Sequence, residues 1–372
     1  MIERAELTSE TRHAPLCGAS DEMIGRESVG FTLNLHLHFA ADSFLRCRQV
    51  MLSTSKLQTS LRILLRTRGQ RSPNARSIAT TGVAGGTQGP NAYCRDLVLK
   101  RDYQAFLTSQ TFPEEHRDAV FALRAFYVEL ATIQESVSSS VIGKMRMQFW
   151  RDAVKGFPDG RPPQHPIALA LYEAYQKAKL PTYHLKRIID ARDAELHAPT
   201  HLTVDSLIAH AESTSSTYLY LLLSLVSLSS SETFSHAASH VGIAQTIATL
   251  LHALPFHASQ GRMVIPAEIT ARHSVNQEEV FRKGGNAKGI DDAVFEFATI
   301  ANDHLITARE MMKETGGKVP VPARPVFVSA VPTALFLERL ENLNFDVFDR
   351  SLQQRSWTLP WRVWRGVYSG DF

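Results

Sequence analysis

Apolar residues recur every three to four positions over most of the chain from residue 93 to the C-terminus. In the clearest stretch, Glu114–Ser138, the apolar stripe consists of Val120, Leu123, Phe126, Leu130 and Ile133. That 3.6-residue period predicts an amphipathic helix, and Pro113 stands where such a helix can begin. No alternating apolar–polar stretch of any length is evident in the sequence, so we predict an all-α fold.

The same periodicity predicts eight further helices. They are expected at Ile142–Val154, Pro166–Ala178, Tyr183–His197, Val204–Leu228, Glu232–Leu254, Gln277–Lys283, Asp291–Lys313 and Pro332–Leu343. Turn-like stretches separate them, and the sequence has no repeat at a fixed period. We therefore expect one all-α domain over residues 93–372, large enough to enclose a pocket between its helices.

The segment 51–80 differs from the rest of the chain in charge. Residues 51–78 hold six Lys or Arg side chains and no acid, and their leucines recur at helical spacing. A basic amphipathic segment predicts a mitochondrial transit peptide, with a disordered basic tail as the alternative. Residues 1–50, with seven acids, are an unassigned extension or an over-extended gene model before a start at Met51. Residues 81–92 are expected to form a flexible linker.

Composition excludes several classes of protein. The longest apolar run, Tyr218–Leu228, is shorter than the ~20 residues needed to span a bilayer. The three cysteines are Cys17, Cys47 and Cys94, so the body of the chain has no disulfide framework and no cysteine-based zinc site. The formal charge of +3 comes from the basic segment, and the near-neutral body argues against a nucleic-acid partner.

Four segments carry motifs in a fixed order: ALRAFYVELATIQE at 122–135, RMQFWRD at 146–152, IDARDAEL at 189–196 and GIAQTIATLLHALPFHASQGRMVIP at 242–266. Together they resemble the squalene/phytoene synthase family of isoprenoid enzymes. The resemblance implies an isoprenoid-synthase-like helical bundle around a central pocket. In that family Asp side chains on two facing helices hold Mg²⁺ ions, which neutralise the diphosphate leaving group of a prenyl diphosphate.

The metal-ligand positions of that resemblance are degenerate in this chain. The first aspartate pair falls on Ala131 and Thr132, and only Glu135 keeps a carboxylate there. The second motif places Ala253 and His257 where the family has aspartates. Alanine offers no donor, and imidazole is a poor ligand for Mg²⁺. We therefore expect no catalytic residue, no metal and no cofactor, and keep these five positions as candidates for lining the pocket.

Nearby acids do not replace the missing aspartates. Glu129 precedes Ala131 by two residues, which rotates its side chain off that helix face. Asp190 and Glu195 match acids of the third motif, but they lie on another predicted helix.

Further segments narrow the resemblance to one branch of the family. Phe126–Ser138, Ile142–Trp150, His236–Gly242 and Phe345–Gln354 are similar to the non-enzymatic mitochondrial branch that serves assembly of respiratory complex I. The resemblance implies a pseudoenzyme on the matrix side of the inner membrane. Complex I subunits or assembly intermediates would be its partners, with peripheral contact to that membrane. Two alternatives remain open: an active squalene/phytoene-type prenyl transferase, and a carrier that holds an isoprenoid or another lipid in the pocket.

Other groups of residues have both a functional and an ordinary interpretation. Glu232, His236 and His240 follow one helix edge, but about 12 Å between the ends prevents all three from binding one ion. Phe149 and Trp150 line a prenyl pocket or belong to the core, and Leu221–Val226 is a core helix or dips into a membrane. A phosphate site or plain surface charge explains Lys144, Arg146, Arg151 and Arg262. The tryptophans of Trp357–Arg365 contact a membrane or partner, or pack into the core.

Overall fold

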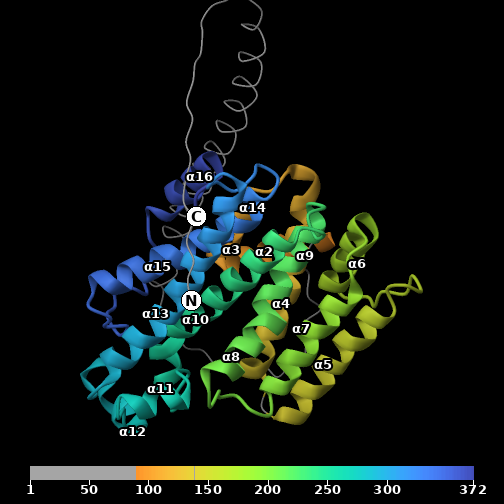
Figure 1. Cartoon of the computed structure of the whole chain (residues 1–372). Coiled ribbons are helices and arrows are strands. Elements are labelled where there is room, and N and C mark those ends of the chain that lie inside the picture. Colours follow the sequence, from red (N-terminus) through yellow and green to blue (C-terminus); the bar gives the residue numbers. More distant parts are fainter. Residues whose placement is uncertain (1–88, 138) are drawn as a thin grey trace, which may run out of the picture. The chain divides into compact units, whose positions relative to one another are not determined.

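The computed structural model describes residues 89–137 and 139–372, so the expectations for the extension, the transit peptide and most of the linker lie outside the described residues. Every regular element of the described part is helical, which confirms the predicted all-α class (Figure 1). The α-helices are α2 Pro90–Arg101, α3 Tyr103–Ser109, α4 Glu114–Ser136, α5 Ser140–Lys155, α6 Pro166–Ala178, α7 Thr182–Glu195, α8 Val204–Ala211, α9 Thr217–Leu225, α10 Glu232–Ser259, α11 Ala267–Arg272, α12 Gln277–Lys283, α13 Ile290–Met311, α14 Arg324–Phe327, α15 Val331–Asn342 and α16 Leu359–Ser369. Short helical turns complete them: η1 Glu212–Ser216, η2 Gly284–Asn286, η3 Met312–Thr315 and η4 Val328–Ala330.

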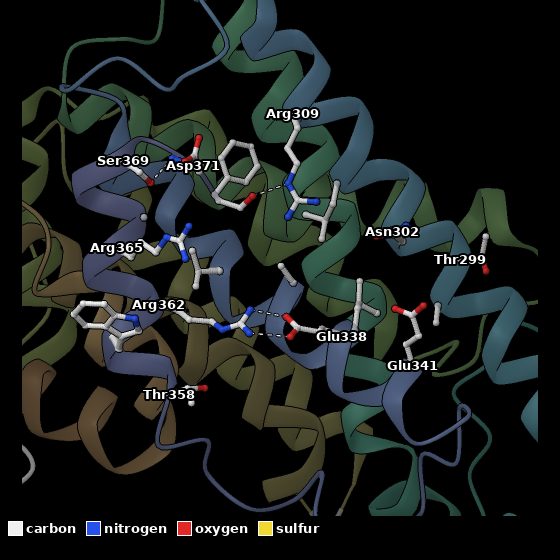
Figure 2. A pocket seen from close by; sticks show the side chains of 18 of the residues that line it. Thr299, Asn302, Arg309, Glu338, Glu341, Thr358, Arg362, Arg365, Ser369 and Asp371 are labelled. Atoms are coloured by element: carbon white, nitrogen blue, oxygen red, sulfur yellow. Dashed lines mark hydrogen bonds and ion pairs between the residues drawn. The ribbon is translucent and has the colours of Figure 1, made fainter.

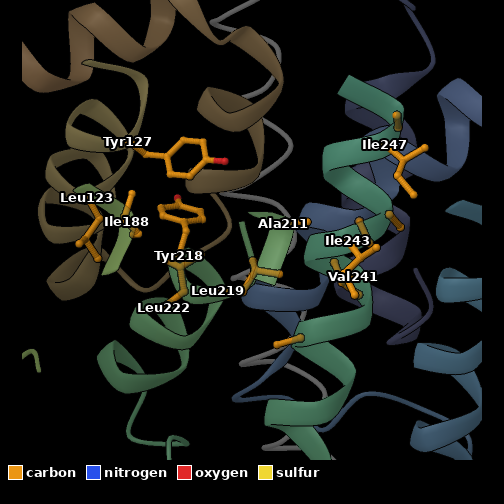
Figure 3. Packing of buried hydrophobic residues seen from close by; sticks show 14 of the residues in the cluster. Leu123, Tyr127, Ile188, Ala211, Tyr218, Leu219, Leu222, Val241, Ile243 and Ile247 are labelled. Atoms are coloured by element: carbon orange, nitrogen blue, oxygen red, sulfur yellow. The ribbon is translucent and has the colours of Figure 1, made fainter. Parts of the chain in front are cut away.

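The long helices pack side by side around one hydrophobic core. α10 lies along α13, α4 packs against α2 and α6, and α5 covers α7 (Figure 1). Ile243 and Ile247 of α10, Leu123 of α4 and Ile188 of α7 are all buried in the same core (Figure 3). Burial of these apolar stripes is the main favourable contribution to folding, at roughly 25 cal/mol for each Å² removed from water.

Residues Val204–Leu228 do not form the single helix that their apolar pattern predicts. α8 ends at Ala211, Glu212–Ser216 forms a turn of π-helix, and α9 follows. The facing helix α10 approaches this turn closely at Gly242, where a Cβ atom would lie 2.4 Å from Ser216 Oγ and 2.5 Å from the Ser216 amide nitrogen. Only glycine therefore fits at Gly242 beside the π turn.

Proline does not end α10 where the sequence predicted. Pro255 lies inside the helix, which continues to Ser259 rather than stopping at Leu254. Proline removes one backbone hydrogen bond but leaves the following turn helical here. The additional turn carries His257, one of the five degenerate motif positions.

The predicted linker is too long at its C-terminal end. α2 begins at Pro90, so residues 90–92 are helical. Proline suits the first helical position because the amide that it lacks would have no helical partner there. The Asn91 amide also donates to Glu173 of α6 at 3.2 Å, which attaches the start of α2 to the domain. The periodicity did not predict α3, α11, α14 or α16, because short helices show too few turns of a pattern.

Candidate functional site

A cavity of about 370 Å³ lies among α3, α4, α7, α8, α9, α10 and α15. All five degenerate motif positions are on its wall: Ala131, Thr132 and Glu135 from α4, and Ala253 and His257 from α10. Helices far apart in the sequence thus bring these positions together. The remaining wall combines apolar side chains, among them Phe112, Val120, Leu222 and Leu250, with a larger number of polar and charged ones, so it suits a ligand that has both apolar and polar parts.

The donors at the motif positions do not fit Mg²⁺. Ala131 and Ala253 have none, and the Thr132 hydroxyl donates to the Glu129 carbonyl at 3.1 Å. His257 Nδ1 accepts a hydrogen bond from Arg262 Nη2 at 2.7 Å, so a cation already occupies that side of the ring. Glu135 is left as a single exposed carboxylate, whereas Mg²⁺ requires several oxygen ligands in octahedral geometry. No group of three His, Cys, Asp or Glu residues in the described chain could hold a metal ion.

The other acids of the cavity are paired with arginines. Asp102 Oδ2 accepts from Arg124 Nε at 2.8 Å, while Asp102 Oδ1 caps α3 by accepting from the Ala105 amide at 2.9 Å. On α7, Arg192 Nη1 donates to Glu195 Oε2 at 2.8 Å. Burial alone would raise the pKa of Glu195, but Arg192 and then His210 more than offset it, so the pKa is lowered. Both carboxylates therefore already have a cationic partner.

Tyr127 of α4 and Tyr218 of α9 lie next to each other (Figure 3). Both rings lie beside Arg124. The Arg124 guanidinium lies 4.9 Å from the ring centre of Tyr127 and 5.2 Å from that of Tyr218. The Tyr127 hydroxyl accepts from Arg192 Nη2 at 3.1 Å and lies 2.8 Å from Ser215 Oγ. Burial raises the pKa of Tyr218 to about 12. For Tyr127 burial acts in the same direction, but the positive charges of Arg192 and Arg124 outweigh it and lower the pKa.

A chain of hydroxyls continues from Tyr127 across to α10. Ser215 Oγ, in the π turn, lies 2.7 Å from Thr246 Oγ1, which donates to the Gly242 carbonyl at 3.0 Å. Because the Tyr127 oxygen already accepts from Arg192, its proton is free to point to Ser215. The π turn and the close approach of α10 at Gly242 therefore together place a chain of hydrogen bonds between α4 and α10 along the cavity wall.

Three imidazoles, those of His201, His210 and His257, complete the polar wall. Burial lowers the pKa of each, and that of His210 falls to about 4. All three rings are therefore uncharged at neutral pH. Since Nδ1 of His257 accepts from Arg262, the proton of this neutral ring is on Nε2.

Two of the four residues proposed for a phosphate site, Arg146 and Arg151, are already paired with acids. Arg146 binds Glu129 Oε1 at 2.5 Å, and Arg151 binds Asp190 at 2.9 Å and Asp193 at 2.7 Å. These pairs leave neither guanidinium available for a phosphate. Trp150 is 1% exposed and packs edge-on against Phe126 at 5.3 Å. Neither Phe149 nor Trp150 lines the cavity, so the core interpretation is correct for Trp150.

The histidine strip on α10 does not converge on one ion. Glu232 and His236 approach to 3.9 Å on the surface, whereas Nδ1 of His240 faces Nδ1 of His304 on α13 at 2.7 Å. His252 instead packs against Phe336 at 5.4 Å. Leu221, Leu222, Leu223 and Leu225 are buried, which confirms the core interpretation of this apolar run. None of the helices of residues 89–372 combines the length and the hydrophobicity that crossing a bilayer requires.

Sequence reasoning missed Arg124, Arg192, Asp102 and Tyr127 as residues of the cavity, and it set Glu195 aside because it lies on a different helix. Arg192 and Glu195 are three positions apart, a spacing that pairs side chains on one helix face. That spacing was readable in IDARDAEL. The contact between α3 and α4 that joins Asp102 to Arg124 spans 22 positions, and no local pattern indicates it.

A second, open groove of about 810 Å³ runs between α13, α15 and α16 (Figure 2). Arg362 of α16 binds Glu338 of α15 with both terminal nitrogens, and Arg309 Nε donates to the Phe372 carbonyl at 2.6 Å (Figure 2). α16 buries Leu359 and Val363 against Val331 and Leu335. Its outer face holds stacked rings, with Trp361 and Trp364 at 4.8 Å and Trp364 and Tyr368 at 5.9 Å.

The exposure of the indole rings distinguishes between the two interpretations of the C-terminal tryptophans, a membrane or partner contact and packing into the core. Trp357 is 86% exposed and Trp361 is 52% exposed. The core interpretation is therefore wrong for both indoles. The apolar stripe of α16 consists of Leu359, Pro360, Val363 and Gly366, whereas Trp357 precedes the helix and Trp361 lies on the wall of the open groove.

Comparison with known proteins agrees with the fold. The sequence profile of squalene/phytoene synthase matches residues 98–365, so this chain belongs to the squalene/phytoene synthase family. A dehydrosqualene synthase crystal structure superposes with a TM-score of 0.63 at 14% identity, over 75% of this chain and 95% of the other.

More similar in sequence are two curated proteins. The chain is 38% identical to NADH dehydrogenase (ubiquinone) complex I, assembly factor 6 of Homo sapiens, over 79% of this chain and 88% of that protein. It is 37% identical to the Drosophila melanogaster homolog of that assembly factor, over 74% of this chain and 83% of the other protein. Within the family, the chain therefore belongs to the group that these relatives represent.

Proposed function

We propose that this protein is a mitochondrial assembly factor for respiratory complex I, acting on the matrix side of the inner membrane. Its partners are complex I subunits or assembly intermediates. The support is the identity to curated assembly factors over most of both chains. In this proposal the squalene/phytoene synthase fold acts as a scaffold and does not ionise a prenyl diphosphate.

The observation that carries the non-catalytic part is the wall of the cavity. Of the positions that would hold Mg²⁺, two are alanines, one hydroxyl bonds to its own helix, and His257 faces Arg262. Without metal ions, and with Arg101 as the lining cation outside the two ion pairs, a diphosphate leaving group has little positive charge to stabilise it as the carbon–oxygen bond breaks. A pseudoenzyme is therefore the interpretation that the donor set favours.

A gene deletion tests the assembly role, with complex I measured by native gel and in-gel NADH dehydrogenase activity. We expect loss of assembled complex I, and recovery with both the wild type and Glu135→Gln, which removes the one retained motif carboxylate. Intact complex I in the deletion strain would rule out the assembly role. Failure of Glu135→Gln with normal expression would argue for chemistry at this motif.

An active prenyl transferase is the competing function. Incubation of the purified full chain with farnesyl diphosphate and Mg²⁺ should release no diphosphate above a blank. Release that depends on both Mg²⁺ and Glu135 would reverse the non-catalytic interpretation.

The peripheral membrane contact is proposed for the outer face of α16. Indole and phenol rings favour the headgroup region of a bilayer, and α16 carries Arg362 and Arg365 but no acid. Arg362 is paired with Glu338, while Arg365 is exposed. An exposed cation on the same helix as stacked aromatic rings suits an anionic lipid surface.

A carrier role is the second candidate, and the cavity itself favours it. A cavity of about 370 Å³, with apolar patches on a wall that is otherwise polar, has room for a small amphipathic lipid. Holding such a ligand is compatible with assembly of complex I, so the two functions do not exclude each other.

A further inference from the structure

The charged side chains of the cavity balance one another. Three arginines and three acids line it, namely Arg101, Arg124, Arg192, Asp102, Glu135 and Glu195. The three histidines on the wall add no charge, because burial keeps their rings neutral. Four of the six charged groups form two close ion pairs, which leaves only Arg101 and Glu135, both exposed, at the edge of the site.

Such a balance disfavours a polyanion. A diphosphate carries several negative charges, and moving it out of water requires compensating cations within contact distance. Arg124 and Arg192 cannot supply them without leaving Asp102 and Glu195 buried and unpaired. The motif positions bind no metal that could take their place. The charged groups of this cavity therefore do not suit a diphosphate, which is the ligand that the family's enzymes bind.

Hydrogen-bond donors are nevertheless available on the wall. Nε of the Arg192 guanidinium is buried and has no hydrogen-bond partner within residues 89–137 and 139–372. The neutral His257 ring keeps its Nε2 proton, since Nδ1 is used by Arg262. A buried donor such as Arg192 Nε is costly unless something accepts from it.

We propose that the cavity binds, without any metal ion, an uncharged ligand that has an apolar chain and an oxygen-containing head group. Its head oxygen accepts from the Arg192 and His257 donors on α7 and α10, and its chain lies along the apolar residues Val128, Ala131, Leu250 and Ala253 of α4 and α10. This inference deepens the carrier function proposed above and rests on it.

The test measures equilibrium binding of labelled farnesol and labelled farnesyl diphosphate to the purified full chain, each with EDTA and with Mg²⁺. We expect saturable farnesol binding that is the same under both conditions. Farnesyl diphosphate should bind at least about tenfold more weakly, with no gain from Mg²⁺. Tighter, Mg²⁺-dependent binding of the diphosphate would overturn the proposal, as would a lack of saturable farnesol binding.

Two variants locate the binding. Ala253→Phe fills the cavity and should lower farnesol affinity by about tenfold or more. Ala209→Phe is the control, because Ala209 is exposed on α8 and does not line the cavity. If Ala253→Phe unfolds, Ala131→Leu on the facing helix tests the same space. Equal farnesol affinity in a folded cavity-filling variant and in the control would place the ligand elsewhere.

Glu135→Gln tests the charge argument separately. Removing this exposed acid leaves one cation in excess, so affinity for farnesyl diphosphate should rise while that for farnesol stays unchanged. Unchanged diphosphate affinity would count against charge balance as the cause of selectivity. These binding assays use purified protein and do not depend on complex I. If the protein binds farnesol as expected but deletion of its gene leaves complex I intact, the assembly role is rejected and the ligand proposal stands.

Discussion

The guanidinium of Arg262 donates to Nδ1 of His257 at 2.7 Å, at a position where the family's motif has an aspartate. Because of this contact, the cavity differs from a metal site by more than its missing carboxylates. The place of a metal ligand is taken by a ring that already has a cationic partner.

Restoring one acid should therefore not restore a metal site. In His257→Asp we expect the new carboxylate to pair with Arg262 and the protein to bind no Mg²⁺ in calorimetric titration. The double variant His257→Asp, Arg262→Ala is the matched comparison, since its carboxylate is unpaired. Stoichiometric Mg²⁺ binding by the single variant would show that Arg262 does not control this position.

Gly242→Ala should be strongly destabilising. Its Cβ would lie 2.4 to 2.6 Å from three atoms of Ser216, two of them in the backbone, so neither helix can yield easily. We expect a loss of about 3 kcal/mol in the free energy of unfolding, measured by urea denaturation. Gly89→Ala is the control, because nothing lies within 4 Å of a Cβ there. Equal urea midpoints for the two variants would mean that α10 and the π turn can move apart at little cost in free energy.

His210 should make the folded protein sensitive to mild acid. Its pKa is lowered from 6.5 to about 4 by burial, so between these values the unfolded chain binds a proton that the folded chain does not. Stability should therefore fall as pH drops through this window, by up to about 1.4 kcal/mol per pH unit from this group. In His210→Gln the slope of unfolding free energy against pH should be smaller. An unchanged slope would mean that His210 is accessible to protons when folded.

The outer face of α16 should govern attachment to anionic membranes. Replacing Trp357 and Trp361 by Ala should reduce co-sedimentation with vesicles of phosphatidylcholine and phosphatidylglycerol, because both indoles are exposed and neither belongs to the core. Tyr183→Ala is the control, as Tyr183 is 63% exposed on α7. Vesicle binding that the tryptophan changes leave intact would reject this surface. If the tryptophan variant loses a protein partner but still binds vesicles, this surface is a protein contact.

Much of the fold was readable from the sequence, because long helices carry several turns of one apolar stripe. α6 and α12 have the predicted bounds, and α4 ends two residues earlier than expected. The errors have local causes: an apolar run hid the π turn at Glu212–Ser216, and Pro255 does not end its helix. α16 was missed because its apolar stripe is short and Trp residues dominate its outer side.

The sequence predicted the motif positions of the cavity but not its charged residues. Motif spacing gave the five positions on α4 and α10 because family motifs preserve the helix face that they occupy. The charges that balance the cavity come from contacts between α3 and α4 and within α7, together with the burial of His201 and His210. Ionisation depends on burial and on partners distant in sequence, and neither can be read from residue types alone.

The π turn has a consequence for insertions and deletions. Such a turn accommodates one more residue than an α-helix of the same length. Deleting a single residue from Glu212–Ser216 would let α8 run into α9 as one regular helix, with α9 close to its present setting because the π turn already absorbs the additional residue. Tyr218 would then stay near Arg124, whereas Ser215, inside the turn, would shift relative to Thr246. The length of this short stretch, and not only its composition, therefore determines which side chains face the cavity.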